Sequence, residues 1–190
     1  MNRCMKQLCV IASVMVCLLF TGCEYPVLPE LKYSSSVSDT YTESEKELYG
    51  AYDVVRVSDG DTIVVKIEDE EVRVRLIGID APESVHPDET QNCANGEVAS
   101  DYLKSLLPVG AKVYLEYDKE TTDEYGRTLA YVYMDDAETM IEMVLLEAGM
   151  ADTMKILPNN KYAYQFEQVK AIASEGNIGF WLDGQFTHGE

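Results

Sequence analysis

The fold of this chain is decided by residues 74–83, which read VRLIGIDAPE. The first half of this stretch is apolar, as in a buried strand, and the second half is a turn with two carboxylates, Asp80 and Glu83. Alternate side chains of a regular strand point to opposite faces, so Arg75 and Asp80, five positions apart, would be separated. Gly78 lies between them and can host a bulge that turns both toward one site. The stretch therefore predicts a strand that leads into a polar site.

Strands and helices are predicted on both sides of this stretch. Five segments have the β-branched content or the alternation of strands: residues 51–57, 62–67, 72–79, 113–117 and 128–134. The first two flank an Asp-Gly turn of the kind found in β-hairpins. Three segments have apolar residues at helical spacing: residues 96–107, 140–148 and about 159–176. Short strands with interposed helices fit a small closed barrel of the α+β class better than a sandwich or a doubly wound sheet.

The composition is that of a folded but strongly acidic protein. The 190 residues are 46% hydrophobic and include 13 tyrosines, which is enough for a core, so the chain is not disordered throughout. The formal net charge is −19. Such a surface attracts cations and repels polyanions at long range. Composition alone therefore disfavours nucleic acid as a partner, and only local motifs can support it.

The N-terminal residues have the pattern of an export signal. Arg3 and Lys6 precede an apolar run at residues 8–20 that is too short for a comfortable membrane span. The segment that ends at Cys23 resembles a bacterial lipobox, which implies cleavage before Cys23 and lipidation of its thiol. An ordinary secretory signal and an uncleaved anchor are the alternatives. The lipobox places the protein in the bacterial cell envelope, facing outside the cytoplasm, whereas a secretory signal would release it.

Four segments are predicted along the chain: a lipoprotein signal peptide (1–22), a flexible tether (23–49), one folded domain (50–183) and a C-terminal tail (184–190). The tether is rich in Ser, Thr, Tyr and Glu and has no apolar periodicity. Once Cys23 is lipidated, Cys93 has no cysteine to pair with, so the mature chain is not a disulfide scaffold.

Three polar motifs follow one another in the folded domain: DGDT (residues 59–62), RLIGIDAPE (residues 75–83) and DEYGRTLAY (residues 123–131). Singly, each has an ordinary explanation, namely a tight turn, a capped turn or a solvated arginine in a hairpin. Together and in this order they resemble the staphylococcal nuclease, or thermonuclease, family, over about residues 50–183. The resemblance implies a five-stranded OB-fold barrel with three packed helices.

The resemblance also implies calcium-dependent cleavage of DNA, RNA or both. Asp61 and Asp80 would bind Ca²⁺ through their carboxylates and Ala81 through its backbone carbonyl. Calcium prefers such oxygen ligands, and this set leaves room in its coordination shell for water and phosphate. The cation would also neutralise the acidic cluster, which otherwise repels a phosphate.

The remaining site residues are assigned by the same resemblance. Glu83 would be the general base that orients or deprotonates the attacking water. Arg75 and Arg127 would hold the scissile phosphate and stabilise charge in the transition state, because a guanidinium is planar and permanently charged. Tyr125 would lie near a terminal phosphate of the substrate. The protein is expected to be a monomer.

The chain departs from the family pattern outside this chemical centre. Glu124 stands where well-known members have a lysine, and Asp88 and Glu89 occupy a loop that is lysine-rich there. Residues 151–157 lack the tyrosines that line the nucleotide pocket in those members. These departures affect base stacking and substrate affinity more than chemistry. The alternative function is a non-catalytic, membrane-tethered OB-fold module that binds calcium, a protein or glycans.

Overall fold

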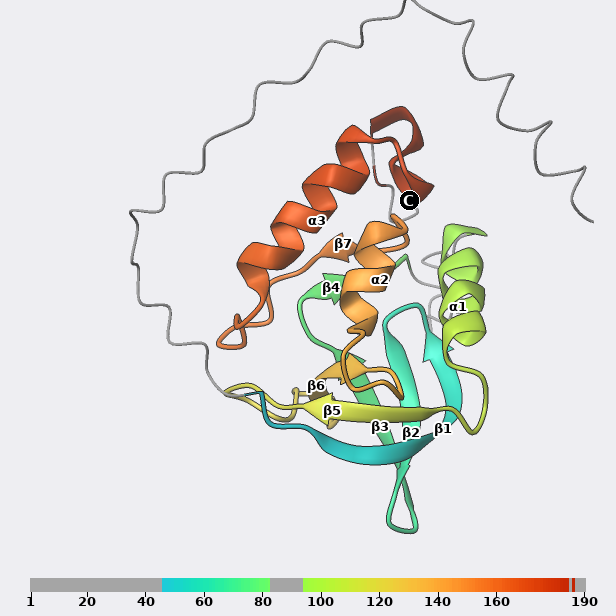
Figure 1. Ribbon diagram of the computed structural model, residues 1–190, viewed down its shortest axis with the longest axis vertical. Helices are drawn as coiled ribbons and strands as arrows, with labels where there is room; N and C mark the ends of the chain where they lie inside the picture. The colour runs from blue at the N-terminus through green and yellow to red at the C-terminus, as the bar shows by residue number, and fades with distance from the viewer. Residues whose placement is uncertain (1–45, 83–93, 185, 187–190) are drawn as a thin grey trace, which may run out of the picture. The chain divides into compact units, whose positions relative to one another are not determined.

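The computed structural model describes residues 46–82, 94–184 and 186 (Figure 1). Glu83, the predicted general base, and Cys23, the predicted lipidation site, lie outside the described residues. The predicted signal peptide, and the tether up to residue 45, also lie outside them.

Five strands close into a barrel in the order β1-β2-β3-β6-β5. Their bounds are β1 (Tyr49–Asp59), β2 (Thr62–Ile67), β3 (Glu70–Leu76), β5 (Lys112–Glu116) and β6 (Thr128–Tyr133). β1 pairs antiparallel with both β2 and β5, which closes the barrel, and β3 pairs with β6 in parallel. Register shifts within β1 allow this long strand to bend between its two partners. The topology confirms the predicted five-stranded OB-fold barrel of the α+β class.

Alternation along the strands separates the barrel interior from its outer face. Ile63 and Val65 of β2 and Val74 and Leu76 of β3 are fully buried and belong to the hydrophobic core. Their neighbours in sequence point the other way, because successive side chains of a strand alternate between faces. Arg75, between two core residues, therefore lies on the outer face of the barrel wall.

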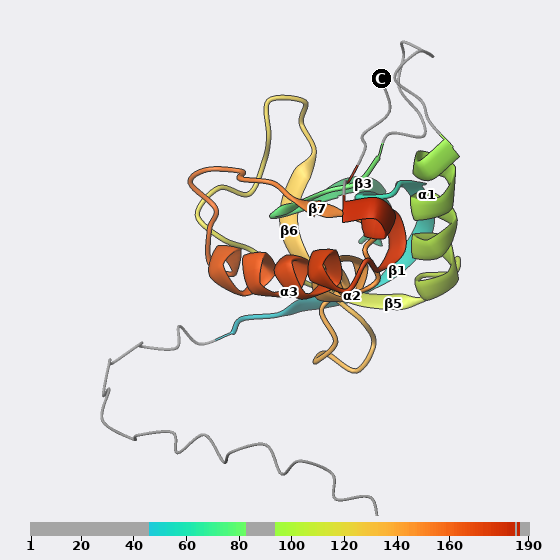
Figure 2. The ribbon, with the colours of Figure 1, turned by 90° about the horizontal axis from the view of Figure 1, so that it is seen from above.

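Three α-helices and a 3₁₀ helix cover the barrel. Their bounds are α1 (Ala94–Leu106), α2 (Ile141–Glu147), α3 (Ala163–Glu175) and the 3₁₀ helix η2 (Gly179–Gly184). α1 packs against β1, while α2 and α3 contact each other (Figures 1 and 2). The three predicted helices are confirmed, although α3 begins later than residue 159. No helix in the described part of the chain is long and apolar enough to cross a membrane.

The third strand differs from the prediction at its C-terminal end. β3 stops at Leu76, and Gly78 adopts a φ of 86°, a conformation that favours glycine. A Cβ atom at Gly78 would also lie 2.5 Å from the Phe166 ring of α3. The chain then forms a new short strand, β4 (Ile79–Asp80), which pairs with β7 (Asp152–Thr153) in a separate sheet. The predicted strand over 72–79 is therefore wrong beyond Leu76. The strand breaks at Gly78, where α3 packs closely against the backbone, and does not form the expected bulge.

Candidate active site

A polar cavity of about 290 Å³ lies on the outer face of the barrel. Nine residues from four strands and three connecting segments line it: Ser58, Asp59, Asp61, Thr62, Arg73, Arg75, Asp80, Arg127 and Met154. Four side chains singled out from the sequence, Asp61, Arg75, Asp80 and Arg127, therefore line one cavity. These four residues lie up to 66 positions apart in the sequence, and the fold brings them together.

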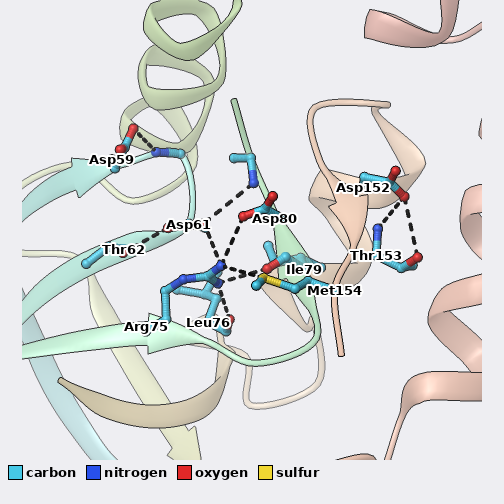
Figure 3. Close-up of polar contacts among 12 residues, drawn as sticks. Asp59, Asp61, Thr62, Arg75, Leu76, Ile79, Asp80, Asp152, Thr153 and Met154 are labelled. Carbon is cyan, nitrogen blue, oxygen red and sulfur yellow. Dashed lines mark hydrogen bonds and ion pairs between the residues drawn. The ribbon is translucent and has the colours of Figure 1, made fainter. Parts of the chain in front are cut away.

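Arg75 is the centre of this cavity's polar contacts (Figure 3). Its side chain is only 6% exposed, and Nη2 lies 2.9 Å from Asp61 Oδ2 and 3.3 Å from Asp80 Oδ1. Nη1 donates hydrogen bonds to the carbonyl oxygens of Leu76 at 2.6 Å and Ile79 at 2.8 Å. The guanidinium is thus held by four oxygens in a fixed orientation. Because two of these are carbonyls on either side of the turn after β3, the turn itself positions the arginine.

Asp61 is placed by the tight β1–β2 turn. Its Oδ1 accepts a hydrogen bond from Thr62 Oγ1 at 2.8 Å, and its Oδ2 lies 3.5 Å from the donating Ala81 backbone nitrogen. Gly60 approaches Ala81 so closely that a Cβ atom there would lie 2.6 Å from the Ala81 Cβ. Burial raises the pKa of Asp61 above its usual range, and the Arg75 guanidinium and Thr62 hydroxyl oppose that rise. Positive charge beside this carboxyl therefore stabilises its ionised form.

Arg127 is held by the loop that precedes β6. Its Nε donates to Asp123 Oδ2 at 2.6 Å, and Asp123 Oδ1 accepts from the backbone nitrogens of Tyr125 and Arg127 at 3.0 and 2.8 Å. Burial opposes ionisation of Asp123, but these hydrogen bonds from Arg127 keep its pKa below the ordinary value. Within the described residues the guanidinium uses only Nε, which leaves both Nη groups for an anion in the cavity.

Two residues predicted for the site, Tyr125 and Ala81, do not line the cavity with their side chains. Tyr125 is 74% exposed and does not line the cavity, and its ring centroid is 5.4 Å from the Arg127 Cζ atom. Ala81 is buried and follows Asp80 directly, so its backbone is next to the cavity. Glu83 comes two residues later, beyond the described segment. The predicted base therefore stays a prediction.

The donor set at this cavity is consistent with a hard cation. Asp61 and Asp80 approach the same nitrogen of Arg75, so two negative charges face one positive charge. Two carboxylates and a backbone carbonyl are the kind of ligands that Ca²⁺ takes among its six to eight oxygens. No group of three or more His, Cys, Asp or Glu side chains with metal-site geometry occurs among residues 46–82, 94–184 and 186. The described residues would therefore supply part of a coordination shell, with water and substrate completing it.

Five cavity residues were not assigned a role from the sequence: Ser58, Asp59, Thr62, Arg73 and Met154. Thr62 donates to Asp61, and the sulfur of Met154 lies 3.6 Å from Arg75 Nη2. Arg73 is exposed at the cavity's edge. Arg73 and Arg75 are two positions apart in a strand and so share one face, and this spacing in the sequence could have indicated that Arg73 also lines the site. No local pattern marked Met154, because its contact arises from packing of the segment after β7.

The fold and the cavity together define an OB-fold protein with a polar cavity in which two arginines and two carboxylates meet. Residues 73–183 match the family model described as staphylococcal nuclease homologue, and the chain belongs to this family.

Relatives with assigned names support this membership. The chain is 39% identical over 142 residues to a thermonuclease of Staphylococcus intermedius, which covers 74% of this chain and 82% of that protein. It is 41% identical over 130 residues to a thermonuclease of Staphylococcus hyicus, covering 68% and 75% of the two chains. Endonuclease YhcR of Bacillus subtilis is 34% identical over 145 residues, which cover 73% of this chain and 12% of that protein.

Proposed function

We propose that this chain is a calcium-dependent nuclease that hydrolyses phosphodiester bonds of DNA, RNA or both outside the cytoplasm. Family membership and relatives named thermonuclease and endonuclease support the nuclease class and a nucleic-acid substrate. One observation carries the site assignment: Arg75 and Arg127 line the same cavity as the carboxylates of Asp61 and Asp80. Arginines and carboxylates at one point are what binding a phosphate ester beside a cation requires.

Arg75 and Arg127 bind the scissile phosphate in this proposal. The Arg75 guanidinium is fixed by Asp61, Asp80 and two carbonyls before substrate arrives, so little reorganisation is needed during the reaction. Arg127 is fixed through Nε and lines the cavity, so its Nη donors would be available to the phosphate. As water adds to phosphorus, negative charge grows on the phosphoryl oxygens, and both guanidinium groups stabilise it.

Asp61, Asp80 and the Ala81 carbonyl would hold Ca²⁺, which when bound supplies Lewis-acid polarisation of a phosphoryl oxygen and neutralises the two carboxylates. Glu83 would accept the proton of the attacking water. It follows Asp80 by three positions in the sequence. Tyr125 lies at the edge beside Arg127, where it would contact a terminal phosphate.

A location outside the cytoplasm is also part of the proposal. The basic residues, short apolar run and Cys23 of the N-terminal segment support a lipid-anchored protein of the bacterial cell envelope, or a secreted one if the lipobox is not used. We propose that it acts as a monomer. Fractionation of cells that produce the protein or its Cys23→Ala variant tests the anchor: the membrane-bound fraction should become soluble in the variant, and an unchanged membrane fraction would exclude lipidation at this residue.

The proposed reaction is tested with single-stranded DNA in calcium or in excess chelator. The wild-type chain should cleave DNA only with calcium, and Glu83→Gln should lower kcat by at least about 100-fold because the base is lost. Glu70→Gln, an exposed position on β3, is the matched control and should behave as wild type. Equal activity of the wild type with calcium, the wild type with chelator and Glu83→Gln would sink the nuclease mechanism. Binding of DNA without cleavage would favour the non-catalytic module.

A further inference from the structure

Arg73 lines the cavity beside the two arginines assigned to the scissile phosphate. It precedes Arg75 by two positions on β3, and residues two apart in a strand lie on the same face. The two differ in environment, since Arg75 is buried and fixed by four oxygens whereas Arg73 is exposed. An exposed guanidinium at the edge of a phosphate-binding cavity can contact a substrate without any rearrangement of the core.

The ion pairs of the other arginines set Arg73 apart. Arg56 pairs with Glu71 at 2.5 Å, Arg75 with two aspartates, and Arg127 with Asp123. Arg73 alone among the arginines of the described segments pairs with no described carboxylate. The chain has a net charge of −19, and most lysines and arginines of its described segments form an ion pair with an aspartate or glutamate. An unpaired guanidinium at this place therefore provides a positive charge for an external anion.

The position of Arg73 on the barrel indicates which anion it meets. In the strand register Arg73 is opposite Val64 of β2, and Val64 is opposite Arg56 of β1. Val64 is fully buried although it alternates with the core residues Ile63 and Val65, so it lies on the outer face. OB-fold proteins bind oligonucleotides across the outer face of strands 2 and 3. Arg73 is the next outward-facing side chain of β3 after Arg75, about 6.5 Å farther along the strand.

We propose that Arg73 binds the phosphate adjacent to the scissile one and thereby directs the substrate strand along β3. The inference rests on the proposed nuclease function and extends it to the path of the polynucleotide. It also offers a way for an acidic protein to hold a polyanion: besides the scissile phosphate at Arg75 and Arg127, a second phosphate has its own cation. A solvated surface arginine with no ligand is the ordinary alternative, and kinetics separate the two.

The test compares Arg73→Gln with Arg56→Gln, which removes the same charge from the same row of the barrel face but from an exposed ion pair. Both variants should keep the wild-type melting temperature. With calcium and a single-stranded deoxyoligonucleotide, Arg73→Gln should raise KM about five- to tenfold and leave kcat unchanged. A contact made equally in the ground state and the transition state changes KM alone. The slope of log(kcat/KM) against log[salt] should become shallower by about 0.7, the change for one lost phosphate contact on a single strand.

Three results would overturn the assignment, and they are distinguishable. If Arg73→Gln matches Arg56→Gln in both KM and salt slope, Arg73 contacts no phosphate. If it lowers kcat as strongly as Arg127→Gln does, Arg73 acts on the scissile phosphate rather than its neighbour. If the wild-type chain does not cleave the oligonucleotide with calcium, the proposed nuclease function fails, and the role of Arg73 fails with it.

Discussion

Two polar clusters in this chain differ in how the charge of their carboxylates is compensated. At the cavity, Asp61 and Asp80 share the guanidinium of Arg75, so two negative charges face one positive charge. At the other cluster, Glu116 of β5 is 2% exposed, and its Oε1 accepts from Lys161 Nζ at 2.5 Å. Its Oε2 accepts from the hydroxyl groups of Tyr133 at 2.7 Å and Tyr162 at 2.9 Å.

The two clusters differ in whether the charge and hydrogen bonds of the carboxylate are satisfied within the described fold. Lys161 neutralises Glu116, and two phenols complete its hydrogen bonds, so this carboxylate is satisfied within the fold and joins β5 and β6 to the segment before α3. At the cavity, Asp61 and Asp80 converge on one guanidinium, and two further arginines, Arg73 and Arg127, line the same space. The proposed site would gain from an added cation and phosphate, whereas Glu116 already has its hydrogen-bond partners within the described fold.

The largest expected effect separates activity from stability at the cavity. Arg127→Gln should lower kcat on single-stranded DNA by about 10²–10³-fold, because a pre-oriented donor to the transition-state charge is lost. Stability should change little, since Arg127 is partly exposed and Asp123 keeps two backbone donors. Steady-state cleavage assays with calcium and thermal melting measure the two quantities.

Arg56→Gln is the control for this comparison. It removes an arginine whose ion pair with Glu71 is more than half exposed on both sides, so kcat and melting temperature should both stay near wild type. A kcat for Arg127→Gln within a few-fold of this control would mean that the cavity arginine does not act on the reacting phosphate.

The second largest effect is expected at the Glu116 cluster, where a substitution should lower stability without changing activity. Glu116→Gln replaces one acceptor oxygen by an NH₂ donor that faces other donors and leaves Lys161 without its counter-charge. We expect the free energy of unfolding to fall by about 2–3 kcal/mol, measured by denaturant titration, with kcat unchanged for the folded protein. Glu120→Gln, an exposed position beyond the end of β5, should cost nothing measurable. A drop in kcat without a drop in stability would reverse the roles of the two clusters.

The smallest effect concerns Glu142 of α2, a buried carboxyl that forms an ion pair with no lysine or arginine of the described segments. It is fully buried and accepts from the Val132 backbone nitrogen at 3.1 and 3.2 Å, and burial raises its pKa well above the ordinary 4.5. The folded chain thus binds this proton more tightly than the unfolded chain. Its contribution to stability is present below about pH 4.5 and is lost as the pH rises through the raised pKa, by up to about 1.4 kcal/mol per pH unit.

Glu142→Gln should remove this part of the pH dependence. Relative to wild type, the variant should gain stability as the pH increases above 4.5, measured by denaturant titration over a series of pH values. Glu147→Gln, at an exposed position of the same helix, should leave the wild-type profile unchanged. Parallel profiles for wild type and Glu142→Gln would show that Glu142 does not titrate abnormally.

Much of the fold was predictable because its signals are local. Alternating β-branched residues, the Asp-Gly turn and apolar residues at helical spacing identified all five barrel strands and three helices. The end of the third strand was not predictable, since Gly78 breaks β3 next to the Phe166 ring, which is 88 positions later in the sequence. The two-residue strands β4 and β7 were also missed, because two residues carry no periodicity.

The sequence by itself determined the membership of the candidate site: two aspartates on turns, Arg75 on a strand and Arg127 after a loop, in the order of a known family. Only the tertiary structure decided that Asp61 and Asp80 share one guanidinium, that Glu116 is fully compensated and that Arg73 has no carboxylate partner in the described segments. The physical reason is that charge compensation depends on distances between segments far apart in the chain. Those distances are set by barrel closure and by the packing of turns and helices, and local patterns do not encode them.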